Sequence, residues 1–159
     1  MPVRKGIALT ASDDKTARIW DLATGELKQI LRPAIGSGEI GRMYGAAIHP
    51  TTNIVAIAGT TAQGASGHKI LLFSVITGQL VDTIDARAGD IKKLAYSPDG
   101  KLLIATYSGG NGLRAFNSRG QVVFEHKFKA RSYGLDVSSN GLVAASSMDG
   151  KVHLFRIQA

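Results

Sequence analysis

Two short segments of this chain share an arginine, a tyrosine and a glycine at the same spacing. They are Arg42-Met43-Tyr44-Gly45 and Arg131-Ser132-Tyr133-Gly134. Arginine donates paired hydrogen bonds to carboxylates, and tyrosine offers a rigid ring that loses little entropy on binding. The chemistry predicted for these residues is therefore recognition of an acidic or polar partner segment.

Other residues that could carry chemistry are scattered. Residues 36–41 fit the G-x-G-x-x-G spacing, but a strand-like stretch follows them, whereas a dinucleotide loop requires a helix. The four histidines, at positions 49, 68, 126 and 153, are not spaced as metal ligands, and there are no cysteines. We expect no catalytic, cofactor-binding or metal site, and no enzyme activity.

Composition indicates a globular protein. The 159 residues are 44% apolar and 19% charged, with a net charge of +7. The basic residues are spread along the chain in short clusters, which argues against nucleic-acid binding. No apolar run resembles a signal peptide or reaches the ~20 residues that span a bilayer. We expect a soluble cytoplasmic protein without membrane contact.

A phrase of similar residues occurs four times and predicts the fold. Its aromatic residue is Trp20, then Phe73, Phe116 and Phe155, so it recurs every 39–53 residues. Short alternating strands and turns such as Ser97-Pro98-Asp99-Gly100 surround each copy. Repeats of roughly 40–45 residues with four strands indicate propeller blades. We predict an all-β protein: a partial β-propeller of four-stranded antiparallel blades.

The phrases Ile19-Trp20-Asp21, with Thr24-Gly25 after it, and Ser97-Pro98-Asp99-Gly100-Lys101 resemble the WD-repeat β-propeller family. In that family an aspartate in the turn after the second strand bonds to a Gly-His pair ahead of the first strand. Asp14 and Asp149 match the aspartate, but no Gly-His pair precedes a first strand. We therefore expect the buried polar network of the family to be largely absent. The resemblance implies a non-enzymatic scaffold that presents a propeller face to other proteins or peptides.

The expected domain is a single propeller segment over residues 1–159, with blades at about 6–32, 42–85, 90–127 and 131–158. First strands line the central channel in this family. Alignment through the turns at Pro50 and Pro98 places Asp90 and Lys92 opposite the two Arg-x-Tyr segments. The predicted protein-binding residues around one mouth of the channel are Arg42, Tyr44, Lys92, Arg131 and Tyr133. In the alternative interpretation, each Tyr packs between blades and each Arg is solvated.

The expected strands make about three and a half blades, with Trp20 buried between two of them. An open arc exposes apolar end blades, which favours a homo-oligomer or pairing with a complementary propeller segment. An alternative function is a sensor or regulatory propeller within a larger multidomain protein. Nucleic-acid binding and hydrolysis at the channel mouth have less support from the residues.

Overall fold

The computed structural model describes residues 6–64, 67–108 and 112–158, which form fourteen β-strands and no helix. The outer sheets have three strands each: β1 (Ile7–Ala11), β2 (Ala17–Asp21), β3 (Leu27–Leu31), and β12 (Ser132–Val137), β13 (Leu142–Ser147), β14 (Lys151–Arg156). The two middle sheets have four strands each: β4 (Met43–Ile48), β5 (Ile54–Gly59), β6 (Lys69–Ser74), β7 (Leu80–Asp85), and β8 (Ile91–Tyr96), β9 (Leu103–Tyr107), β10 (Gly112–Phe116), β11 (Val122–Lys127).

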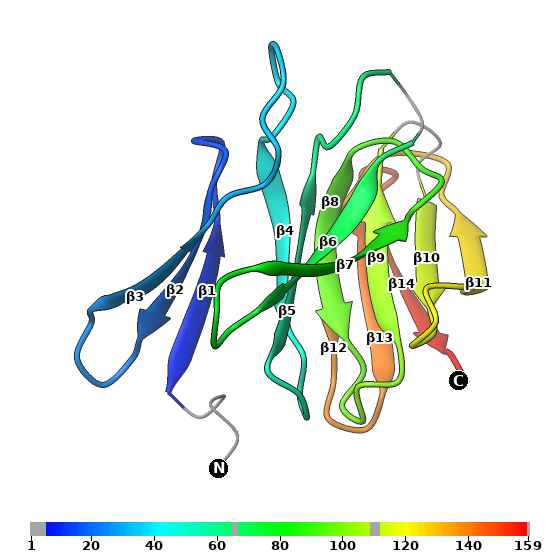
Figure 1. Cartoon of the computed structure of the whole chain (residues 1–159). Coiled ribbons are helices and arrows are strands. Elements are labelled where there is room, and N and C mark those ends of the chain that lie inside the picture. Colours follow the sequence, from blue (N-terminus) through cyan, green and yellow to red (C-terminus); the bar gives the residue numbers. More distant parts are fainter. Residues whose placement is uncertain (1–5, 65–66, 109–111, 159) are drawn as a thin grey trace.

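Each sheet is an antiparallel meander, because neighbouring strands in the chain are also neighbours in the sheet. The four sheets stand side by side in chain order (Figure 1). The strands β4, β8 and β12 begin their sheets, and β8 lies next to both β4 and β12. This arrangement confirms the predicted all-β fold, a partial β-propeller with blades packed face to face.

The register of the strands shows that the four sheets repeat one another. The aromatic residues of the repeated phrase all lie on the third strand of the propeller plan, each opposite a small or aliphatic residue of the second. The pairs are Trp20 with Ala8, Phe73 with Val55, Phe116 with Leu103, and Phe155 with Val143. Positions in different sheets can therefore be compared residue by residue.

Three apolar cores join the four sheets, one at each contact between neighbours. Ile19, Leu31, Ile57 and Phe73 belong to the core between the first two sheets. Ile70 and Phe116 contribute to the next core, while Leu113 and Val143 contribute to the last. Most of these side chains are fully buried. Burial of such side chains contributes about 1.5–3 kcal/mol each, which holds the sheets together without helices.

Trp20 does not lie between two sheets, and the sequence-based prediction of its burial is wrong. Its strand neighbour Ile19 faces the second sheet and is buried. Because side chains alternate along a strand, Trp20 points to the opposite face of the first sheet. There it is only half buried, and its indole N–H donates to Thr10 Oγ1 at 3.0 Å.

The turn Ser97-Pro98-Asp99-Gly100 joins β8 to β9 and depends on its glycine. Gly100 has φ of +75°, and a Cβ there would lie 2.5 Å from a ring carbon of His49. The Ser97 hydroxyl donates to Asp99 Oδ1 at 2.7 Å and accepts the Leu102 N–H at 2.9 Å. The hydroxyl contact is the main reason that the pKa of Asp99 lies below its ordinary value.

Candidate functional site at the mouth of the channel

The first strands of three sheets each carry a β-bulge at the same place. The register shifts between Met43 and Gly45 in β4, between Ile91 and Lys93 in β8, and between Ser132 and Gly134 in β12. The residues skipped by these bulges are Tyr44, Lys92 and Tyr133. A bulge leaves its extra residue out of the ladder and redirects its side chain. The same local device therefore positions three of the predicted binding residues.

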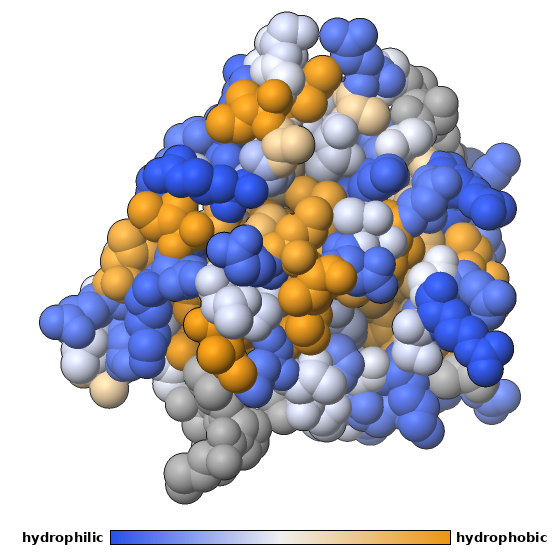
Figure 2. All heavy atoms as spheres, viewed as in Figure 1, coloured by the Kyte–Doolittle hydropathy of each residue, from blue (hydrophilic) through white to orange (hydrophobic). Residues whose placement is uncertain are grey.

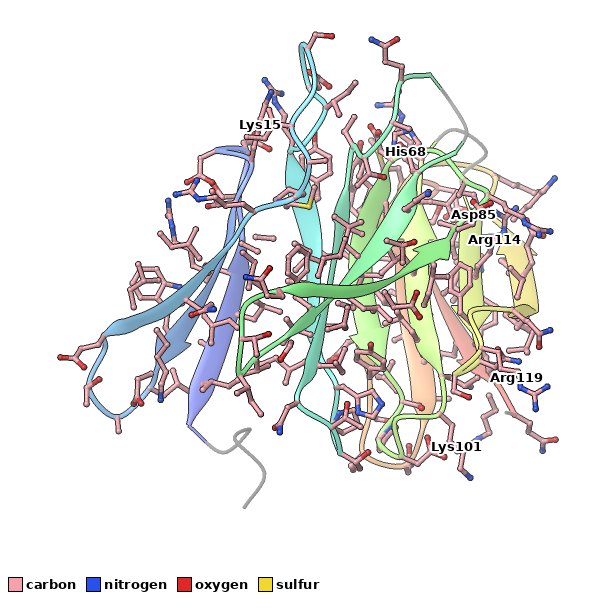
Figure 3. All side chains as sticks on the ribbon, in the orientation of Figure 1. Lys15, His68, Asp85, Lys101, Arg114 and Arg119 are labelled. Carbon is pink, nitrogen blue, oxygen red and sulfur yellow. The ribbon has the colours of Figure 1, made fainter. Side chains whose placement is uncertain are left out.

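These three residues line one open hollow of about 670 Å³. Lys93 and Met43 also line it, and the turn after β1 contributes Ser12 and Asp13. The hollow lies at the end of the molecule where β4, β8 and β12 begin. Lys15 and His68 lie at this end in Figure 3, whereas Lys101 and Arg119 lie at the other end. The hollow is basic on its β8 side and acidic on its β1 side.

Lys92 is held in place by two contacts. Its Nζ lies 4.3 Å from the centre of the Tyr44 ring and 3.2 Å from Asp90 Oδ2. A cation over an aromatic face and beside a carboxylate is both fixed in position and partly neutralised. Lys93, the next residue, is exposed and has no ion pair within the described ranges. Lys93 therefore carries the more available charge, although the sequence did not single it out.

Asp90 connects the hollow to a buried histidine of the preceding sheet. Thr60 donates its hydroxyl to Asp90 Oδ1 at 3.1 Å, and the same hydroxyl lies 3.4 Å from the Tyr44 hydroxyl. His68 is 0% exposed, and its Nε2 lies 3.7 Å from Asp90 Oδ1. The expectation that a buried polar network would be largely absent needs correction here, because this network links two sheets.

The ring of His68 is oriented by its loop. Nδ1 accepts the Thr61 N–H at 3.1 Å, so the proton of the neutral ring lies on Nε2, which is 3.0 Å from the Gly64 carbonyl oxygen. Gly67-His68 is the Gly-His pair of this chain, but it precedes the third strand of its blade, β6, whereas the family pattern has the pair ahead of a first strand. Its partner Asp90 lies just before β8, the first strand of the next sheet.

Arg42 and Arg131 flank the hollow without lining it. They occupy equivalent positions, since the Arg42 carbonyl accepts the Thr60 N–H at 3.0 Å and the Arg131 carbonyl accepts the Met148 N–H at 2.9 Å. Arg42 Nη1 pairs with Glu39 Oε1 at 3.0 Å. The Arg131 side chain is exposed and has no ion pair within the described ranges.

The remaining residues considered in the sequence lie away from the hollow. After the glycine-rich residues 36–41 the chain enters β4, so no helix follows them. His126 and His153 are 5.6 Å apart between ring centres, within a cluster of phenylalanines. Among the described residues no group of three or more His, Asp or Glu side chains is arranged to hold a metal ion. Asp14 and Asp149 both accept backbone N–H groups within their own turns, whereas the resemblance implies a bond to a Gly-His pair.

The geometry defines a partial propeller whose first strands shape a polar mouth, and comparison with known proteins agrees with this architecture. Residues 4–21 match the family described as "WD domain, G-beta repeat". Over 110 residues, 66% of this chain, the sequence is 31% identical to "Autophagy-related protein 18" of Eremothecium gossypii. Both similarities support the WD-repeat resemblance of the sequence. The chain spans about a fifth of the length of this curated relative, since the similarity covers 20% of that protein.

In the described part of the chain, no helix is long and apolar enough to cross a membrane.

Proposed function

We propose that this chain is a non-enzymatic, cytoplasmic interaction scaffold whose channel mouth binds an acidic, extended segment of a partner protein. The observation that carries this proposal is the convergence of the three bulged residues Tyr44, Lys92 and Tyr133 in one hollow. Tyrosine and basic side chains bind carboxylates and peptide surfaces with modest loss of entropy.

The charges suggest how such a segment lies. Lys93 and Arg131 are exposed cations on the β8 and β12 side, while Asp13 lies across the hollow. Carboxylates of the ligand are therefore expected near Lys93 and Arg131, with the Tyr44 and Tyr133 rings below the peptide. Arg42 also binds a ligand carboxylate, after its ion pair with Glu39 has opened.

A fluorescein-labelled hexaglutamate peptide tests the proposal by fluorescence anisotropy. Replacing Lys93 and Arg131 together by alanine should weaken binding about tenfold, because two exposed ion pairs contribute roughly 0.5–1 kcal/mol each. The matched control is Lys101→Ala with Arg119→Ala, which removes the same charge at the opposite end (Figure 3). Equal weakening in both double variants, or equal binding of hexaglutamine, would show only diffuse charge attraction.

We also propose that the scaffold self-associates. Each outer sheet has one face that no other sheet covers among the described residues, and exposed apolar side chains lie on such a face. Uncovered apolar sheet faces favour association with a complementary surface.

A second candidate function is a regulatory propeller within a larger protein, favoured by the match to only 20% of the curated relative. An immunoblot of the source cells with an antibody against residues 12–28 tests it. A band well above 16.8 kDa supports this reading, and a band at 16.8 kDa contradicts it.

A further inference from the structure

Every contact between neighbouring sheets uses two different faces, which we call forward and reverse. The forward face of a sheet packs on the next sheet along the chain, and the reverse face packs on the preceding one. Ile19, Leu72 and Ala115 are equivalent positions on this face, since they pair with Leu9, Ala56 and Ile104 of the adjacent strands. Each of the three packs into an inter-sheet core.

The last sheet has the same forward face, but no described sheet covers it. Leu154 of β14 pairs with Ala144 of β13, so Leu154 is the equivalent of Ile19, Leu72 and Ala115. Val152 is the equivalent of the fully buried Ile70 and Leu113. On the last sheet Val152 is 67% exposed and Leu154 is 61% exposed.

The first sheet has the corresponding uncovered reverse face. Phe73 and Phe116 occupy the reverse faces of their sheets and are 3% and 0% exposed. Trp20 occupies the same position on β2 but is absent from all three cores. In Figure 2 hydrophobic residues are also visible on the outer side of the first sheet, over the region of β3, and Ile30 of β3 is exposed.

We propose that the forward face of β12–β14 in one copy packs on the reverse face of β1–β3 in a second copy. Phe73 shares its core with Ile19 and with the partly buried Leu9. By the same geometry, Trp20 of the second copy packs on Leu154 and Ala144 of the first. The occupant is a second copy because the chain itself carries both halves of this contact, in the register of its internal contacts.

The two faces differ, so the contact between copies is head-to-tail. A closed ring forms when the forward face of the second copy packs in the same way on the reverse face of the first. Two copies bring together eight sheets, which lies within the four to eight blades of closed propellers. Closure would surround the mouth with the bulged residues of both copies. This inference rests on the proposed self-association and names its surfaces.

Sedimentation velocity and the fluorescence of Trp20, the single tryptophan, test the contact in the full 159-residue chain. Wild type should sediment with twice the 16.8 kDa mass, and dilution should shift its emission to the red as Trp20 becomes hydrated. Leu154→Lys should raise the dissociation constant of the dimer at least tenfold and give the red-shifted emission at all concentrations. Leu154 is exposed in the single chain, so the thermal midpoint of the Leu154→Lys variant, measured by circular dichroism, should remain near that of monomeric wild type.

Val123→Lys is the matched control, since Val123 lies on the outer strand β11 and is also exposed. It should remain dimeric. A wild type that stays monomeric, or a mass that grows beyond two copies with concentration, overturns the inference. A dimer that survives Leu154→Lys with unchanged emission shows association through another surface, which overturns the inference but not the proposed self-association. Hexaglutamate binding is measured separately, so its failure is distinguishable from either result.

Discussion

Asp90 is the residue that joins the two halves of the candidate site. Its Oδ2 holds Lys92, and its Oδ1 accepts from Thr60 beside the buried His68. The carboxylate therefore fixes the cation on the solvent side and accepts the Thr60 hydroxyl on the buried side, where His68 Nε2 lies 3.7 Å from it. Hydrogen bonds to charged groups contribute roughly 1.5–3 kcal/mol, more than neutral ones.

Asp90→Ala should lower the free energy of unfolding by about 1–3 kcal/mol, because it leaves Thr60 without its carboxylate acceptor and Lys92 without its counter-ion. Urea denaturation followed by circular dichroism measures the change. Asp82→Ala is the control, since Asp82 is exposed and, within residues 6–64, 67–108 and 112–158, its side chain accepts only the N–H of Thr83. Similar losses in the two variants would contradict a structural role for the Asp90 network.

Turn aspartates make stability depend on pH. The Thr16 hydroxyl holds the pKa of Asp14 below its ordinary value of 3.8, and the Ser97 hydroxyl does the same for Asp99. Because the unfolded chain binds these protons more readily, the stabilisation is complete above pH 3.8 and is lost as the pH falls through the lowered pKa values.

The free energy of unfolding should therefore decrease as the pH is lowered from about 5 to about 2. Asp14→Asn with Asp99→Asn should flatten this dependence. The charge-matched control, Asp82→Asn with Asp136→Asn, should retain the wild-type slope more fully. Denaturant titrations at several pH values compare them, and parallel curves for all three proteins would exclude this source of acid sensitivity.

At the scale of strands and sheets, position on the two faces decides what each repeated aromatic residue contributes. Phe116 is 0% exposed between the second and third sheets, whereas Trp20 is half buried on the outer face of the first. The sequence alone predicts the same burial for both, because each is the aromatic residue of the repeated segment and lies on the equivalent strand of its sheet. Only the number of sheets that pack around a strand separates them.

Phe116→Ala should cost about 3–5 kcal/mol of unfolding free energy, as expected for truncation of a large core side chain. Trp20→Ala should cost the monomer clearly less, because much of the indole already contacts water. Chemical denaturation at protein concentrations below the dimer dissociation constant measures both. A Trp20→Ala cost equal to that of Phe116→Ala would mean that the first sheet is covered in the monomer.

At the scale of the whole molecule, the repeat predicted the architecture but not the contacts between repeats. Turn residues and alternation locate nearly every strand, and aligning Arg42, Asp90 and Arg131 identifies equivalent positions before the first strands. The His68–Asp90 contact was not predictable in this way, because it joins a loop of one sheet to the start of the next. The sequence also did not predict Lys93 as a site residue, because Lys93 aligns with Gly45 and Gly134, which have no side chain. The bulge at Lys92, which the sequence does not reveal, brings both lysines to one hollow.

We propose that the bulged residues of three first strands form one binding surface at the channel mouth. Titration of ¹⁵N-labelled protein with hexaglutamate, followed by two-dimensional NMR, locates the bound peptide residue by residue. We expect the largest amide shifts at Tyr44, Lys92, Lys93 and Tyr133, with Lys101 and Arg119 unchanged. Shifts spread evenly over the basic residues at both ends, or gathered around Lys101 and Arg119, would contradict it.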